Sequence, residues 1–174
     1  MHVSGQRVDD GEDHSSGTND RDHLVEKIAA YATERSLTVA CAESLTGGAI
    51  ASALARGNAA DTWFAGGIVS YMSEVKFRVL GVSEGPVVTS ACAQQMAEGV
   101  TTLLGADASV AVTGVGGPDE QEGQPPGTVF IATRVDGRTD VSHHHFTGDP
   151  GAVLDQTVTA AVAGLLQRLA SEPA

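Results

Sequence analysis

The residues best suited to chemistry stand in the segment Ala-Glu-Ser-Leu-Thr-Gly-Gly, residues 42–48. The preceding run, 37–41, is apolar, rich in β-branched residues and too short for a helix, so it predicts a buried strand. The following run, 49–55, is made of good helix formers. Ser44 would then lie at a strand-to-helix turn, where unpaired backbone N–H groups carry positive partial charge. Such a turn offers a nucleophile beside a site for a phosphate or an acyl-transfer oxyanion.

A serine nucleophile needs a base, and Lys76 is the candidate. Between residues 23 and 107 the only other lysine is Lys27, which falls on the expected exposed side of a helix. Lys76 follows a strand end that carries Tyr71, which could hydrogen-bond the lysine or the substrate. A lysine is a base only when neutral, so burial must lower its pKa from about 10.4 toward about 7 to 8. Spacing alone favours the alternative, a surface lysine with its charge in water.

A second cluster of interest is the glycine-rich segment 114–117, which follows an apolar run at 108–113 and precedes Pro118. It fits neither a P-loop nor the complete dinucleotide-binding fingerprint. As a bare pattern it predicts a tight turn. At the carboxyl end of a strand in an open α/β sheet, the same turn would line a ligand crevice.

The remaining metal-ligating and nucleophilic side chains favour structural roles. His143, His144 and His145 are consecutive and would alternate between the faces of a strand, so we expect a solvated strand and no metal site. Cys41 and Cys92 are widely spaced in the chain. We expect both to be reduced and buried as small hydrophobic residues.

The composition limits the class of protein. A net charge of −12, from 22 acidic and 10 basic residues, argues against nucleic acid as a partner. No apolar run approaches the roughly 20 residues of a membrane span. The N-terminal residues show no apolar signal segment, so we expect a cytoplasmic location and no membrane partner. A hydrophobic fraction of 41% is typical of a globular domain with a real core.

The chain is expected to form a polar, disordered tail over residues 1–21 and one domain over 22–171. Ser73 and either Thr89 or Ser90 are expected N-caps, Gly81 a helix end, and Asp136-Gly137 a hairpin turn. Segment 119–126 is expected to be a loop. The alternation predicts an α/β fold, a single-domain layered mixed sheet with helices packed on it. We expect helices over 22–35, 47–56, 73–80, 90–104 and 151–170, and strands over 37–42, 63–71, 108–113, 128–134 and 140–146.

Several motifs occur together in one order. They are residues 42–48, residues 69–76 with the sequence Val-Ser-Tyr-Met-Ser-Glu-Val-Lys, residues 111–118, residues 126–129 and residues 147–149. In this arrangement the chain closely resembles the CinA C-terminal domain family over roughly residues 23–170. The characterised activity of that family is nicotinamide mononucleotide amidase.

The resemblance implies a Ser/Lys hydrolase that converts nicotinamide mononucleotide to nicotinic acid mononucleotide and ammonia. Ser44 matches the nucleophile, Lys76 the general base, and Tyr71 a residue that supports the site. The amides of Thr46, Gly47 and Gly48 would stabilise the oxyanion. No metal or organic cofactor is implied, and family members form homo-oligomers, dimers or larger. The expected substrate-binding residues are Glu43, Thr46, Gly47, Gly48, Thr113, Gly114 and Gly116.

The chain departs from the family pattern at four places. Leu45 replaces a usual cysteine, while Gly66, Gln124 and Pro150 stand at positions that are often basic. If a lost charge holds the substrate phosphate, the protein would favour another amide. Two alternatives therefore stand beside the nucleotide amidase: an amidase for an unphosphorylated pyridine amide, and a ligand-binding or interaction module that has lost turnover.

Overall fold

A computed structural model describes residues 15–171, and residues 1–14 of the predicted tail lie outside that range. Over residues 15–171 the chain forms six helices and five strands. The helices are α1 (Ser15–Arg35), α2 (Ala49–Leu54), α3 (Ala60–Trp63), α4 (Ser73–Leu80), α5 (Ser90–Leu104) and α6 (Pro150–Ser171). The strands are β1 (Val39–Glu43), β2 (Phe64–Val69), β3 (Ala108–Gly114), β4 (Thr128–Val135) and β5 (Arg138–His145). Within the described residues, no helix is both long and apolar enough to cross a membrane.

The strands form one mixed sheet in the order β2-β1-β3-β4-β5. β1 pairs in parallel with β2 and β3, whereas β4 pairs antiparallel with both β3 and β5. The hairpin between β4 and β5 turns at Asp136 and Gly137, whose φ angles of 50° and 77° are both positive. Two positive φ angles are the signature of a type I′ turn, which matches the twist of the strands. The predicted hairpin is therefore confirmed.

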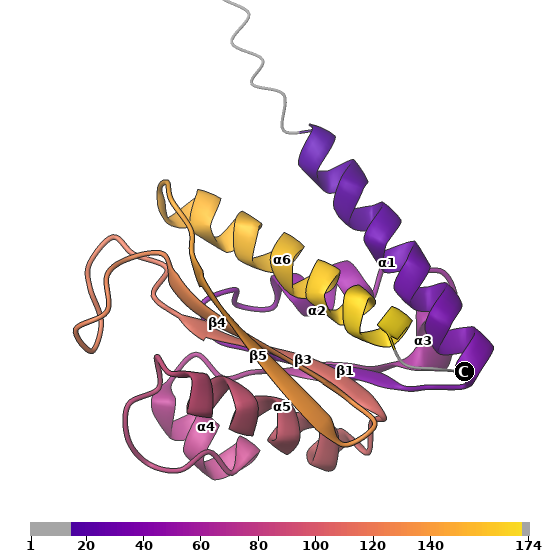
Figure 1. Cartoon of the computed structure of the whole chain (residues 1–174), viewed down its shortest axis with the longest axis horizontal. Coiled ribbons are helices and arrows are strands. Elements are labelled where there is room, and N and C mark those ends of the chain that lie inside the picture. The colour runs from indigo at the N-terminus through magenta and orange to yellow at the C-terminus, as the bar shows by residue number, and fades with distance from the viewer. Residues whose placement is uncertain (1–14, 172–174) are drawn as a thin grey trace, which may run out of the picture.

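Helices cover both faces of the sheet (Figure 1). α1, α2, α3 and α6 pack on one face, and α4 and α5 lie on the other. Because both faces are covered, every residue of β1 and β3 is buried, as expected for parallel strands in an α/β protein. The predicted α/β fold, a single layered domain with a mixed sheet, is confirmed.

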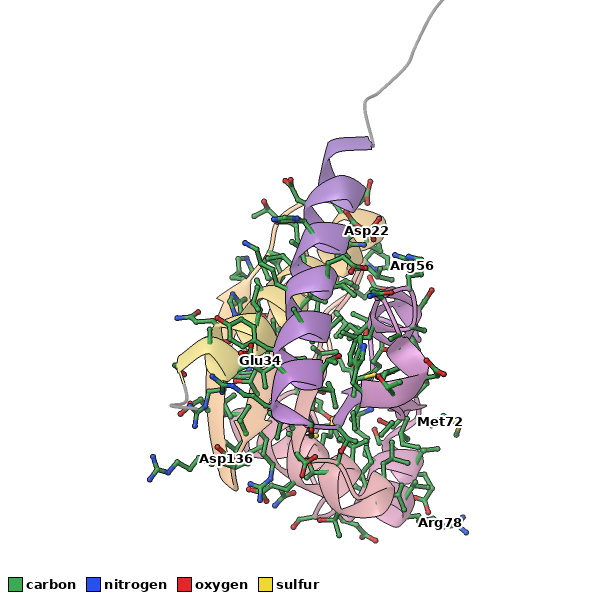
Figure 2. All side chains as sticks on the ribbon, turned by 90° about the vertical axis from the view of Figure 1, so that its right-hand side faces the viewer. Asp22, Glu34, Arg56, Met72, Arg78 and Asp136 are labelled. Carbon is green, nitrogen blue, oxygen red and sulfur yellow. The ribbon has the colours of Figure 1, made fainter. Side chains whose placement is uncertain are left out.

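α1 begins at Ser15, inside the segment that we predicted to be a disordered tail up to residue 21. Arg21 explains the difference, because it is 7% exposed and its guanidinium bonds α6 at Asp155 Oδ1 (2.7 Å) and Thr159 Oγ1 (2.9 Å). The next residue, Asp22, forms an ion pair with Arg56, with 3.5 Å between its Oδ1 and the Arg56 Nη2. Figure 2 shows the two side chains at the same side of the molecule. These contacts join residues that are far apart in the sequence, so local composition could not predict them.

The other element boundaries differ in small ways. β2 ends at Val69, so Tyr71 lies beyond the strand that we expected to contain it, and the short helix α3 was not predicted. Met72, not Ser73, occupies the N-cap position of α4, and no side chain caps that helix. Thr89 caps α5 through its hydroxyl, which accepts from the Cys92 N–H at 3.1 Å, as one of the two expected options.

Candidate active site

Three strand ends carry the candidate site residues. Ser44 follows β1 directly, Tyr71 lies shortly after β2, and Thr113 is near the end of β3. Because β1 pairs in parallel with both β2 and β3, the carboxyl ends of these strands lie side by side. Ligand sites of open α/β sheets form at this edge. The topology thus brings together residues that came from separate motifs.

A cavity of about 280 Å³ opens at this edge. Ser44 lines it and is 9% exposed, and no other residue within 15–171 hydrogen-bonds its hydroxyl. The hydroxyl is therefore uncommitted to the surrounding structure. Of the residues predicted to form the site, those that line the cavity are Ser44, Tyr71, Lys76, Thr113, Gly114 and Gly116.

Lys76 is buried on α4 and is 1% exposed. Its Nζ donates to the backbone carbonyls of Ser70 at 2.5 Å and Tyr71 at 3.4 Å. Burial lowers the pKa of Lys76, while the neighbouring Cys92 and Glu122 raise it by a smaller amount. The opposing effect of Cys92 needs a thiolate, and burial raises the pKa of that thiol to about 11. The net effect lowers the pKa of Lys76, which makes the uncharged amine easier to form.

The hydrogen bonds of Lys76 suit that uncharged form. A neutral amine has two N–H bonds and one lone pair, whereas an ammonium has three N–H bonds and no acceptor. The Ser70 and Tyr71 carbonyls accept two N–H bonds. This leaves the third position on Nζ, the lone pair of the neutral amine, for a group in the cavity. The sequence had favoured a surface lysine at this position on spacing alone, and the structure instead buries it.

Glu43 has a different role from the substrate contact that we expected. It is fully buried, and its carboxylate accepts from the backbone N–H groups of Gly48 (3.1 Å), Ile50 (3.0 Å) and Ala51 (2.7 Å). Its backbone carbonyl accepts from Ser70, from the N–H at 2.7 Å and from the hydroxyl at 3.2 Å. Glu43 thus holds the start of α2 and the end of β2 around the neighbouring serine.

The turn after Ser44 also uses amides that we expected to be free. The Gly47 N–H bonds the Ser44 carbonyl at 3.1 Å, and the Gly48 N–H is bound by Glu43. Within residues 15–171, no acceptor binds the backbone N–H groups of Leu45 and Thr46. The Thr46 hydroxyl is likewise buried without a partner among the described residues. Leu45, which lines the cavity, and Thr46 are therefore the better candidates for oxyanion donors than the two glycines.

The loop between β3 and β4 forms another wall of the cavity, and sequence reasoning did not assign its carboxylates. The carboxylate of Glu122 accepts from the backbone N–H groups of Val87 (2.9 Å) and Val88 (2.8 Å). The Thr113 hydroxyl donates to the Val87 carbonyl at 2.7 Å, which fixes the same segment through a second hydrogen bond. Asp119 and Glu120 line the cavity. Their position just after the glycine-rich turn was the signal that could have identified them.

Two of the three histidines on β5, His143 and His144, pack on aromatic rings. His143 stacks on Phe130 with ring centroids 4.6 Å apart, and His144 stacks on Phe146 at 5.2 Å. Burial lowers the pKa of His144, whose Nε2 lies 2.8 Å from the Ser142 hydroxyl. Among residues 15–171, no group of three or more His, Cys, Asp or Glu side chains could hold a metal ion.

The chain is similar in sequence to one protein family and to several bacterial proteins. A family model described as the CinA C-terminal domain matches residues 21–169. A protein of Bacillus subtilis (strain 168), whose name refers to competence-damage inducibility, is 40% identical over 130 residues. That match covers 72% of this chain and 31% of the relative. The chain spans about a third of the length of the curated relatives it matches.

Crystal structures share the fold over nearly their whole length. A competence-damaged protein (CinA) superfamily protein of Klebsiella pneumoniae is 35% identical with a TM-score of 0.83, covering 87% of this chain and 99% of that chain. One from Escherichia coli is 32% identical with a TM-score of 0.84, covering 94% of each chain. These structures therefore resemble both the sequence and the fold of nearly the whole described chain.

Proposed function

The chain belongs to the CinA C-terminal domain family, and on this premise we propose that it is a serine amidohydrolase. The proposed reaction converts nicotinamide mononucleotide to nicotinic acid mononucleotide and ammonia. The observation that carries the proposal is the cavity that Ser44 and Lys76 share. One side chain brings an uncommitted hydroxyl to it, and the other a buried amine with a lowered pKa.

Acylation would begin with attack of the Ser44 Oγ on the carboxamide carbon. Neutral Lys76 takes the hydroxyl proton as the C–O bond forms, and the carbonyl oxygen becomes an oxyanion. The backbone N–H groups of Leu45 and Thr46 are the donors proposed to stabilise that charge. The protonated lysine then gives its proton to the amide nitrogen, the C–N bond breaks, and ammonia leaves.

Deacylation repeats the same steps with water. Lys76, neutral again after ammonia leaves, takes a proton from a water molecule that attacks the ester carbon. Collapse of the second tetrahedral intermediate returns the proton from Lys76 to the Ser44 oxygen and releases the carboxylic acid, which loses the remaining water proton to solvent and becomes the carboxylate. Each proton transfer to or from Ser44 passes through one amine, and its bonds to the Ser70 and Tyr71 carbonyls fix the position of that amine at the cavity.

One observation supports the amidase for an unphosphorylated pyridine amide as a second candidate. Among the described residues that line the cavity, Lys76 is the sole basic side chain, and Asp119 and Glu120 are acidic. A phosphate therefore finds no arginine there to bind it in the bidentate manner that arginine allows. Comparing nicotinamide mononucleotide with its riboside distinguishes the two substrates.

The test of the proposed function is ammonia release from nicotinamide mononucleotide by the purified wild-type chain and by Ser44→Ala. Release by wild type alone supports the amidase and its nucleophile. A folded wild-type chain that releases no ammonia from the nucleotide or the riboside contradicts the enzyme and favours the binding module. A serine-directed acylating probe gives a second readout, because the amidase requires that labelling of Ser44 be lost in Lys76→Met.

A further inference from the structure

We propose that the cavity selects carboxamides whose ring carries a positive charge, as in an N-ribosylated pyridinium, through Tyr71, Asp119 and Glu120. This inference rests on the proposed function and deepens it, because it names the feature of the substrate that the pocket wall recognises. It predicts a preference for a cationic ring over a neutral ring of the same shape, whether or not a phosphate is attached.

The first support is an aromatic side chain at the mouth of the cavity. Tyr71 lines the cavity and yet is 70% exposed, so it is available to a ligand that enters from solvent. Its backbone carbonyl binds the Nζ of Lys76, which ties the tyrosine to the catalytic amine. The face of an aromatic ring attracts a cation, and a flat pyridinium can stack on it.

The second support is a pair of carboxylates that line the same cavity, in the loop after β3. Asp119 and Glu120 both line the cavity and are exposed. Among residues 15–171, neither carboxylate has an ion pair or a side-chain hydrogen bond. Glu122, in the same loop, anchors it to the amides of Val87 and Val88. The two charges are therefore held at the cavity by a fixed loop and remain available for a cationic ligand.

The third support is the place of the nucleophile relative to these groups. Ser44 lines the same cavity, is nine-tenths buried, and has no hydrogen-bond partner for its hydroxyl among the described residues. A carboxamide that reaches Ser44 leaves its ring toward the exposed residues Tyr71, Asp119 and Glu120. The positive charge of a ring nitrogen then lies near an aromatic face and two carboxylates, whereas a neutral ring gains only the stacking contact.

The experiment compares two ligands of nearly equal shape: nicotinamide riboside, whose ring is cationic, and the neutral carbon-linked riboside of nicotinamide. Dissociation constants are measured by calorimetry on Ser44→Ala, which binds without turnover, and ammonia release is measured on the wild-type chain. The test variant adds Asp119→Asn and Glu120→Gln to Ser44→Ala. The matched control adds Asp136→Asn, which removes a charge at the β4–β5 turn. Figure 2 shows Asp136 on the opposite side of the molecule from Met72, the residue that follows Tyr71.

We expect the cation to bind about threefold to tenfold more tightly than the neutral riboside, as exposed charge pairs usually allow. Neutralising Asp119 and Glu120 should remove most of that preference, and raising the salt concentration should weaken it. Asp136→Asn should leave it unchanged. Equal binding of the two ribosides, or no binding of the cation tighter than about 10 mM, overturns the inference.

The two proposals fail in different ways. Absence of ammonia release from wild type, together with tighter binding of the cation to Ser44→Ala, contradicts the amidase but supports selection of a charged ring. Release from both ribosides with equal kcat/KM supports the amidase and overturns the selection. If the preference for the cationic riboside persists in the variant with Asp119→Asn and Glu120→Gln, the carboxylates have no role in it and Tyr71 alone accounts for it.

Discussion

The backbone carbonyl of Ser70 accepts a hydrogen bond of 2.5 Å from the Nζ of Lys76, whose side chain is 1% exposed. The same Ser70 binds the carbonyl of Glu43 through its N–H and its hydroxyl. Glu43 directly precedes Ser44, so the serine and the lysine are both held by the adjoining ends of β1 and β2. A dyad supported by paired strands keeps its geometry better than one supported by loops, since a sheet is more rigid.

Replacing Lys76 by methionine should abolish the proposed amidase activity and yet make the fold more stable. Methionine has a similar length and carries no charge, so it removes the cost of burying an amine whose pKa burial lowers. The Ser70 and Tyr71 carbonyls lose their donor in this variant, which offsets part of the gain. We expect a net rise of roughly 0.5–2 kcal/mol in the free energy of unfolding at neutral pH. Denaturant unfolding and ammonia release measure the two effects.

The control for this change is Lys27→Met, on the exposed side of α1. It should alter neither property by much. The stability gain of Lys76→Met should also shrink as the pH rises toward 10.5, the ordinary lysine pKa, because above it the unfolded chain no longer binds the proton. A loss of stability in Lys76→Met would contradict the inference that the buried amine is a burden on the fold.

The pH dependence of kcat/KM should show an ascending limb that reports Lys76. Only the neutral amine can take the Ser44 proton, and burial lowers its pKa below the ordinary 10.5. Activity should therefore rise with pH, about tenfold per unit below the lowered pKa, and level off above it. Initial rates across a buffer series at constant ionic strength test this. A flat profile from about pH 6 to 9 would contradict Lys76 as the titrating base.

The sequence was sufficient to predict the layered fold and the edge of the sheet at which the candidate site forms. Apolar runs before Ser44 and before Gly114 identified two strands whose ends carry polar or glycine residues. Because these strands pair in parallel, their carboxyl ends lie at the same edge of the sheet. Periodicity and turn chemistry are local signals, so they are readable in a single chain. That is why most helix and strand boundaries agree within a few residues.

The contacts between distant segments could not be predicted in the same way. The sequence shows that Glu43 precedes Ser44, but not that its carboxylate turns toward the start of α2 instead of the cavity. Nor does it show that Glu122 reaches Val87, since that pairing depends on how the loop after β3 folds back. Hydrogen bonds of this kind depend on tertiary geometry, which no local pattern encodes.

Glu43 should be essential to the fold of the site. In Glu43→Ala the amides of Gly48, Ile50 and Ala51 lose a buried acceptor, so we expect a loss of roughly 2–4 kcal/mol in the free energy of unfolding. Glu43→Gln keeps one oxygen but turns an NH₂ group toward backbone donors, so it should lose stability too. Thermal and denaturant unfolding measure the loss.

The comparison for Glu43 is Glu34→Gln, an exposed glutamate on α1 that Figure 2 shows at the surface. It should unfold like the wild-type chain. If Glu43→Gln is as stable as Glu34→Gln and loses only substrate affinity, the side chain contacts the substrate as the sequence first suggested, and the structural role assigned to it here is wrong.

Glu122→Gln should move the ascending limb of the pH profile to lower pH. The negative charge of Glu122 raises the pKa of Lys76, so its removal lets burial lower that pKa further. The amide oxygen that this substitution introduces can still accept from the Val88 N–H, which keeps the loop near its place. At pH values below the limb the variant should therefore be more active than wild type.

Glu84→Gln, at an exposed position, serves as the control. A limb that stays in place or moves upward would show that Glu122 acts on the loop alone and not on the base.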